Sequence, residues 1–205
     1  YTDEGSNISS VPQYSRNYHA LIAESIKSLN SNNPDNVYII AKHFFAAGSL
    51  FSAQAYESNL QAAKLASKFH QFEDSLALLD KAKISASSSG KSVEDVEIQI
   101  AIVNCEKSHI YGKEQSDAAD FGLEILKETG LLIIDELAIK ITRALYEARR
   151  YDEAIEMAEK LKSSESISTK TEGFHFHGLS ISPQERDKSK ERLSLLRKAY
   201  ELASQ

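Results

Sequence analysis

Cysteine and long apolar runs are both nearly absent from this 205-residue chain. Cys105 is the only cysteine, so no disulfide can form within the chain, and a lone thiol favours a reducing, cytoplasmic location. The most apolar stretch, residues 131–134, ends at Asp135 and Glu136. The sequence therefore predicts a soluble protein without a membrane-spanning segment.

Excess positive charge is missing as well. The chain has 24 lysines and arginines against 30 aspartates and glutamates, which gives a net charge of -6, and the basic residues are dispersed among the acidic ones. Binding to a phosphate backbone needs a concentrated positive surface. We therefore expect no nucleic-acid partner.

Proline and glycine are scarce, with three and eight residues respectively. No run alternates apolar and polar residues long enough for a half-buried strand, so the sequence predicts an all-α protein. Residues 1–16 are polar and are expected to form a flexible leader, followed by a single helical domain over residues 17–205. Because the chain begins with tyrosine rather than methionine, we expect it to be a piece of a longer protein.

Helices are expected over residues 18–29, 34–47, 51–70 and 73–84, with a serine-rich loop over residues 85–90. Residues 137–161 predict two antiparallel helices with a turn at residues 149–151. Their apolar positions follow the 3,4 spacing of a buried stripe: Ala138, Ile141, Leu145, Ala154, Ile155, Ala158 and Leu161. Ala154 and Ala158 would allow a close approach of two helices, and Tyr151 is expected to fill the gap at the turn.

The segment Tyr151-Asp152-Glu153-Ala154-Ile155 resembles the start of the second helix of a tetratricopeptide repeat, a helix-turn-helix unit of roughly 34 residues. Small residues at the matching first-helix position are spaced by 42, 37 and 36 residues: Ala63, Cys105, Thr142 and Gly178. This register requires insertions around residues 112–117 and 182–188. The resemblance implies a right-handed α-solenoid of stacked antiparallel helix pairs. A plain helical bundle is the alternative.

A second resemblance covers most of residues 18–203. The order Tyr18-His19, 22–26, 41–44 and 62–66 is similar to the helical region that follows the nucleotide-binding module in STAND-type signalling ATPases. This resemblance implies a regulatory or sensor arm, and no glycine-rich phosphate loop ending in Lys-Ser or Lys-Thr occurs in the chain, so no cofactor is expected. Residues 137–203 also resemble scaffold proteins that recruit a lipid kinase. A scaffold or adaptor subunit, such as a lipid-kinase scaffold or a cochaperone, is therefore the alternative function.

The first helices of such a solenoid line a concave groove, which is where a protein or peptide partner would bind. The partner-binding candidates at groove positions are Lys64, Glu106, His109, Arg143 and Tyr146. Lys64 and Arg143 occupy the same repeat position, and with Tyr146 they would hold an acidic or aromatic peptide. Because isolated surface charges are normally solvated, ordinary solvated charges are the simpler interpretation of these residues. Glu106 intervenes between the two cations, which argues against the carboxylate clamp of cochaperones.

Catalytic and metal-binding residues are not predicted. Cys105 and His109 lie four positions apart, as a thiol and its base would, but a buried structural cysteine is much commoner than a reactive one and is the better explanation of Cys105. His175 and His177 flank Phe176 and would point to different helix faces, which does not suit a shared metal. We expect a protein that is not an enzyme, and an enzyme using Cys105 and His109 is the third hypothesis.

Overall fold

The computed structural model describes residues 13–29, 33–129, 135–182 and 186–205. Over these residues it contains ten α-helices, two short 3₁₀ helices and no strand, which confirms the all-α class. None of the described helices is long and apolar enough to cross a membrane. Helix α1 begins at Gln13, so residues 13–16 belong to this helix and not to the expected leader, whose residues 1–12 lie outside the described residues.

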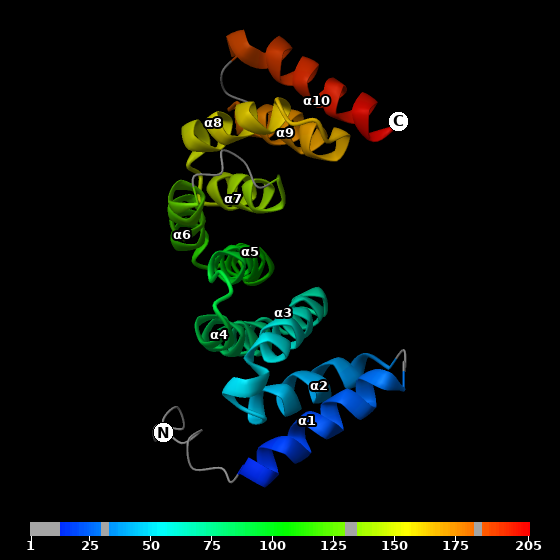
Figure 1. Cartoon of the computed structure of the whole chain (residues 1–205). Coiled ribbons are helices and arrows are strands. Elements are labelled where there is room, and N and C mark those ends of the chain that lie inside the picture. The colour runs from blue at the N-terminus through cyan, green and yellow to red at the C-terminus, as the bar shows by residue number, and fades with distance from the viewer. Residues whose placement is uncertain (1–12, 30–32, 130–134, 183–185) are drawn as a thin grey trace. The chain divides into compact units, whose positions relative to one another are not determined.

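The chain divides into two compact units, residues 1–100 and 101–205. The first unit contains α1 (Gln13–Ser28), α2 (Pro34–Ala46), the 3₁₀ helix η2 (Ser49–Phe51), α3 (Ser52–Lys68), α4 (Phe72–Ser89) and the first part of α5 (Glu94–Tyr111). Each of α1 to α3 packs against the helix that follows it (Figure 1). Ala23, Phe44 and Ala55 form a buried cluster that joins α1, α2 and α3.

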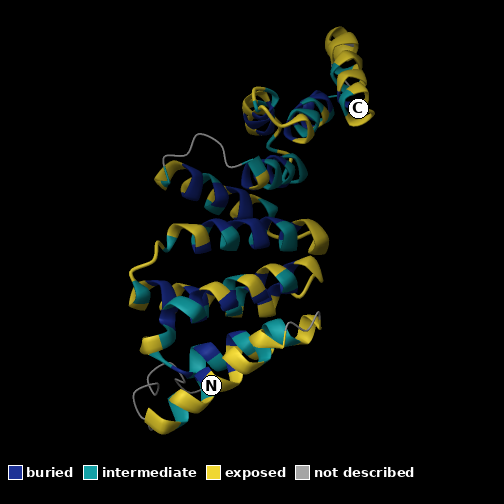
Figure 2. Cartoon of the chain, turned by 45° about the vertical axis from the view of Figure 1, so that its right-hand side comes forward, coloured by how far each residue is buried: buried dark blue, intermediate teal, exposed yellow. Residues whose placement is uncertain are grey.

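The second unit contains the rest of α5, followed by α6 (Gln115–Glu128), α7 (Asp135–Glu147), α8 (Tyr151–Lys162), α9 (Ile167–Ser180), the 3₁₀ helix η3 (Arg186–Lys188) and α10 (Ser189–Ala203). From α6 to α10 each helix packs against the next, and α7 also contacts α9. All residues of the predicted stripe except Ile155 are buried, namely Ala138, Ile141, Leu145, Ala154, Ala158 and Leu161, and Ile155 is half-buried. Figure 2 shows where buried and exposed residues lie along the helices.

Three helix hairpins share one type of turn. The connections between α3 and α4, α5 and α6, and α7 and α8 are each three residues long: 69–71, 112–114 and 148–150. In each, a backbone N–H donates to the carbonyl five residues earlier: Gln71 to Ala66, Lys113 to Ser108, and Arg150 to Leu145. The residue before each donor has a left-handed φ, namely His70, Gly112 and Arg149. This Schellman closure ends the first helix and sends the chain back along it.

The α3–α4 and α7–α8 hairpins also share a burial pattern. Each residue of the first corresponds to the residue numbered 79 higher in the second. The pairs Ala63 and Thr142, Ser75 and Ala154, and Ala82 and Leu161 are all fully buried or nearly so. The Ser75 hydroxyl donates to the Ala63 carbonyl at 2.8 Å, which brings the start of α4 against the small-residue position of α3. One supersecondary pattern is therefore present once in each unit.

Three local predictions were wrong. The insertion expected over residues 112–117 is only the three-residue connection, and the expected loop over residues 85–90 is helical up to Ser89. The hydroxyls of Ser85 and Ser89 donate to carbonyls four residues earlier, and Ser85 is buried, so packing overrides the low helix preference of serine. Tyr151 does not fill the turn: its side chain is 40% exposed, whereas the corresponding Phe72 is buried.

Arg149 is expected to limit stability through its backbone. Its φ of 61° is unfavourable for a residue with a Cβ atom, so Arg149→Gly should raise the free energy of unfolding by about 0.5–1 kcal/mol in urea titrations. Arg149→Ala is the matched control, because it removes the same side chain but keeps Cβ. An equal gain from the alanine variant would show that the side chain, and not the backbone, is responsible.

Candidate functional site

Four of the five predicted partner-binding residues lie in the second unit, on the first helices of its pairs. Glu106 and His109 belong to α5, and Arg143 and Tyr146 belong to α7. The fifth, Lys64, is exposed on α3 of the first unit. The site described below consists of the second-unit residues and of the neighbours they contact.

Glu106 and His109 are both engaged with α7. A Glu106 carboxylate oxygen lies 2.7 Å from Nζ of Lys140, and Nδ1 of His109 lies 2.5 Å from Oε1 of Glu147. The four side chains are partly exposed, so each pair adds only a modest amount to stability. These contacts hold α5 beside α7.

Arg143 and Tyr146 form a cluster with Phe176 of α9. The guanidinium carbon of Arg143 lies 5.7 Å from the centre of the Phe176 ring, and the Tyr146 ring lies 6.2 Å from it. Tyr151, at the start of α8, extends the cluster with its ring 6.0 Å from that of Tyr146. Phe176 is buried, while the other three side chains are accessible. We call these four residues the aromatic-arginine surface.

The aromatic-arginine surface suits recognition of a carboxylate next to an apolar group. Stacking on Phe176 restricts the Arg143 side chain, so less rotational freedom is lost when its N–H donors engage a ligand. No described carboxylate forms an ion pair with Arg143. Two tyrosines add rigid contact area beside it, which is typical of protein-binding surfaces.

Arg150 fixes the start of α8, and with it Tyr151. Its guanidinium lies 2.6 Å from Asp120 of α6 and 2.5 Å from Glu153 of α8. The hydrogen bonds that Arg150 donates to Glu153 and Asp120 raise the pKa of Arg150, and the bonds that Glu153 accepts lower the pKa of Glu153. Charge-assisted contacts to two helices place the tyrosine that follows Arg150 at the edge of the surface.

Cys105 is not arranged as a nucleophile. The thiol is buried and its Sγ lies 3.5 Å from the carbonyl oxygen of Ala118, while His109 contacts Glu147. Burial raises the pKa of Cys105 to about 12, an effect that the nearby Lys140 ammonium only partly opposes. Since the thiolate is the reactive form, this environment suits a structural cysteine that packs α5 against α6.

His175 and His177, the pair considered as metal ligands in the sequence, contact different neighbours. His177 is buried, with Nδ1 2.9 Å from Glu159 and 3.1 Å from Lys162, and burial is the main cause of its lowered pKa. His175 is exposed, with Nδ1 3.7 Å from Glu172. Within the described ranges, no three histidine, cysteine or acidic residues are grouped so that they could hold a metal ion.

Cys105 is expected to resist alkylation in the folded protein. With a pKa of about 12, its thiolate is so sparse at mildly alkaline pH that iodoacetamide should react at least about 100-fold more slowly than in the unfolded chain. Mass spectrometry of timed reactions with and without denaturant would give both rates. Rapid labelling of the folded chain would restore the hypothesis of an enzyme with a Cys105 nucleophile.

Sequence reasoning did not identify Lys140, Glu147, Tyr151 or Phe176 as parts of this site. Lys140 and Glu147 lie three residues before and four residues after Arg143, so helical spacing alone would have placed them on the same face of α7. Phe176 comes from a different helix pair, and only the packing of α7 against α9 brings it under Arg143.

No family model, curated protein or solved structure matches the chain.

Proposed function

We propose that this chain is a non-catalytic protein-interaction module whose helix pairs stack as a right-handed, tetratricopeptide-like solenoid. The observation that carries the proposal is the helix hairpin that recurs 79 residues later with the same turn and burial pattern. Packing of each of α1 to α3 and of α6 to α9 on the helix that follows it, and of α7 on α9, supports it, because first helices of successive repeats contact each other in such arrays.

A protein or peptide with a carboxylate beside an aromatic or aliphatic group is the partner that the aromatic-arginine surface favours. Arg143 supplies paired N–H donors, and Tyr146 and Tyr151 supply contact area. The net charge of -6 supports a protein partner over nucleic acid. The buried Cys105 thiol supports a binding role over a catalytic one, and it suits a reducing cytoplasmic compartment.

The module would act as the regulatory or sensor arm of a larger signalling ATPase. This part of the proposal is based on short segments over residues 18–66, which resemble in their order the helical region of signalling ATPases of that class. The alternative is a scaffold or adaptor subunit that joins other proteins, which the same helix pairs would serve. The two differ in the expected partner: a nucleotide-binding module for the sensor arm, and a stable multiprotein complex for the scaffold.

The test is a comparison of partners captured by the immobilised chain from lysate of the source organism and identified by mass spectrometry. The chain with Arg143→Glu and Tyr146→Ala is expected to lose a partner that the unchanged chain retains. Lys113→Glu, on the α5–α6 connection, is the matched charge-reversal control and should retain it. Circular dichroism should be the same for all, because the altered side chains are outside the core.

Retention of the same partners by all these variants would overturn the assignment of the aromatic-arginine surface. A separate Lys64→Glu variant tests the predicted contribution of α3 in the first unit. A captured protein that contains a nucleotide-binding module supports the sensor arm. Capture of a defined complex without such a module supports the scaffold.

A further inference from the structure

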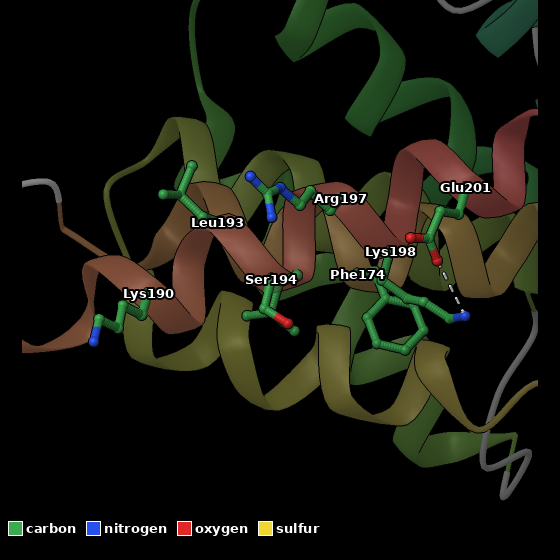
Figure 3. Close-up of a pocket in the computed structure, with 8 residues that line it drawn as sticks. Phe174, Lys190, Leu193, Ser194, Arg197, Lys198 and Glu201 are labelled. Atoms are coloured by element: carbon green, nitrogen blue, oxygen red, sulfur yellow. Dashed lines mark hydrogen bonds and ion pairs between the residues drawn. The ribbon is translucent and has the colours of Figure 1, made fainter.

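A cleft of about 570 Å³ lies between α9 and α10, on a side of α9 different from that which carries Phe176. Phe174 contributes to the cleft, and two residues along an α-helix correspond to a rotation of roughly 200°. In Figure 3 the Phe174 ring lies beside Ser194 and Lys198 of α10. The lining residues are Phe174, Lys190, Leu193, Ser194, Leu195, Arg197, Lys198 and Glu201. This α9–α10 cleft is separate from the aromatic-arginine surface.

Cations dominate the charged lining of the cleft. The charged lining residues are Lys190, Arg197, Lys198 and one carboxylate, Glu201, which lies 3.4 Å from Nζ of Lys198. Lys190 and Arg197 are exposed, and no residue in the described part of the chain pairs with either. A local excess of positive charge on a chain with a net charge of -6 is the complement of an acidic ligand.

The cleft also offers apolar surface. Leu193 is 57% exposed, and Phe174 is only partly buried even though the ammonium of Lys162 lies 5.3 Å from its ring centre. Covering this surface would remove apolar area from water, which is favourable. A ligand that carries only charge would leave it exposed, so the matching ligand has an apolar side chain as well.

The spacing of the two unpaired cations fits a peptide. Lys190 and Arg197 are seven residues apart on α10, which corresponds to roughly 10 Å along the helix axis. In an extended peptide, residues i, i+2 and i+4 face the same side, and residues i and i+4 are about 13 Å apart, a span that the long lysine and arginine side chains can cover. An extended segment can therefore place the carboxylates of residues i and i+4 beside the two cations, with the apolar side chain of residue i+2 between them.

We propose that the α9–α10 cleft binds an acidic segment of a partner protein. An apolar side chain of the segment contacts Phe174 and Leu193, and the carboxylates on either side pair with Lys190 and Arg197. The inference adds a second binding surface to the proposed interaction module. It depends only on the charge and shape of the α9–α10 cleft. The proposal of a binding cleft and the proposal of binding at the aromatic-arginine surface can therefore be disproved independently.

The experiment measures fluorescence anisotropy of a fluorescein-labelled synthetic peptide added to the full chain. The probe is a short peptide with a central leucine and phenylalanine flanked by glutamates, and its matched peptides carry glutamine or lysine at the glutamate positions. The acidic peptide should bind at least about tenfold more tightly than the glutamine peptide, a difference of ~1.4 kcal/mol. Added salt should weaken its binding.

Variants locate the binding. Lys190→Glu together with Arg197→Glu should lower the affinity for the acidic peptide by at least about tenfold. Leu193→Ala should lower the affinity for both the acidic and the glutamine peptide. Lys127→Glu, an exposed charge reversal on α6, is the control and should leave the affinity within about twofold. The altered residues are exposed, and circular dichroism with thermal unfolding checks that each variant is folded.

Several results would overturn the inference. Equal affinity for the acidic, glutamine and lysine peptides would show that charge does not determine binding. Unchanged affinity of the double variant for the acidic peptide would show that the peptide binds outside the cleft. A short single-stranded oligonucleotide, measured in the same way, tests the other common polyanion. Tighter binding of the oligonucleotide than of the acidic peptide would indicate that the cleft binds nucleic acid and not a protein partner. None of these outcomes depends on Arg143 or Tyr146.

Discussion

Leu145→Ala is expected to lower the free energy of unfolding by about 2–5 kcal/mol, because it leaves a cavity between tightly packed helices. The Leu145 side chain is fully buried in α7, at the centre of the stripe that packs against the neighbouring helices. The corresponding residue of α3 is Ala66, which is also buried, so alanine itself suits this helix position. The loss therefore reports packing, and urea titration followed by circular dichroism would measure it.

Ile167→Ala provides the control for this cavity. Ile167 begins α9 and is 52% exposed, so its truncation should change the free energy of unfolding by about 0.5 kcal/mol or less. If Leu145→Ala were as mild as Ile167→Ala, the buried interface of α7 would not be tightly packed. That result would contradict the arrangement that positions Arg143 and Tyr146.

The second large effect is expected at Gly173, where α9 approaches the backbone of α8. A Cβ atom added to Gly173 would lie 2.8 Å from the backbone nitrogen of Lys162 and 2.9 Å from the carbonyl oxygen of Ala158. Alanine favours a helix over glycine by about 1 kcal/mol, but the backbone atoms it meets cannot rotate away. We expect Gly173→Ala to lower the free energy of unfolding by about 1–3 kcal/mol.

Gly122→Ala tests a side-chain clash in place of a backbone clash. Its added Cβ would lie 2.6 Å from Cγ1 of Ile141, a fully buried side chain that is stiff at χ1. The loss should therefore be similar to that at Gly173, and the comparison uses the same denaturant titration. A Gly173→Ala variant more stable than the unchanged chain would show that α8 and α9 are not in such close contact.

Two spacings in the sequence predicted much of the fold. The 3,4 spacing of apolar residues over 137–161 correctly predicted a buried stripe on α7 and α8, and the small residues Ala63, Cys105 and Thr142 are buried as expected. Such periodicities survive in the sequence because helix geometry is local and each buried face repeats every 3.6 residues. The all-α class follows from the same regularity and from the scarcity of helix-breaking residues.

Turns and helix ends were predicted less well. The serines that end α4 indicate a loop by composition, yet their hydroxyls bond to the preceding turn and Ser85 is buried. Arg149 and His70 adopt a left-handed φ that favours glycine, so these two of the three Schellman closures carry no glycine that would have predicted them. In both cases the energy of packing two helices outweighs the preference of a single residue.

By itself the sequence determined the helical class and the buried faces of the helices, because these depend on spacing within one helix. Only the tertiary structure decided what each polar side chain meets. Glu106 and His109 contact α7, Arg143 lies over Phe176, and α10 presents cations beside an open apolar surface. These contacts join residues far apart in the chain. The spacing of side chains within one helix does not determine which face of another helix those side chains will contact.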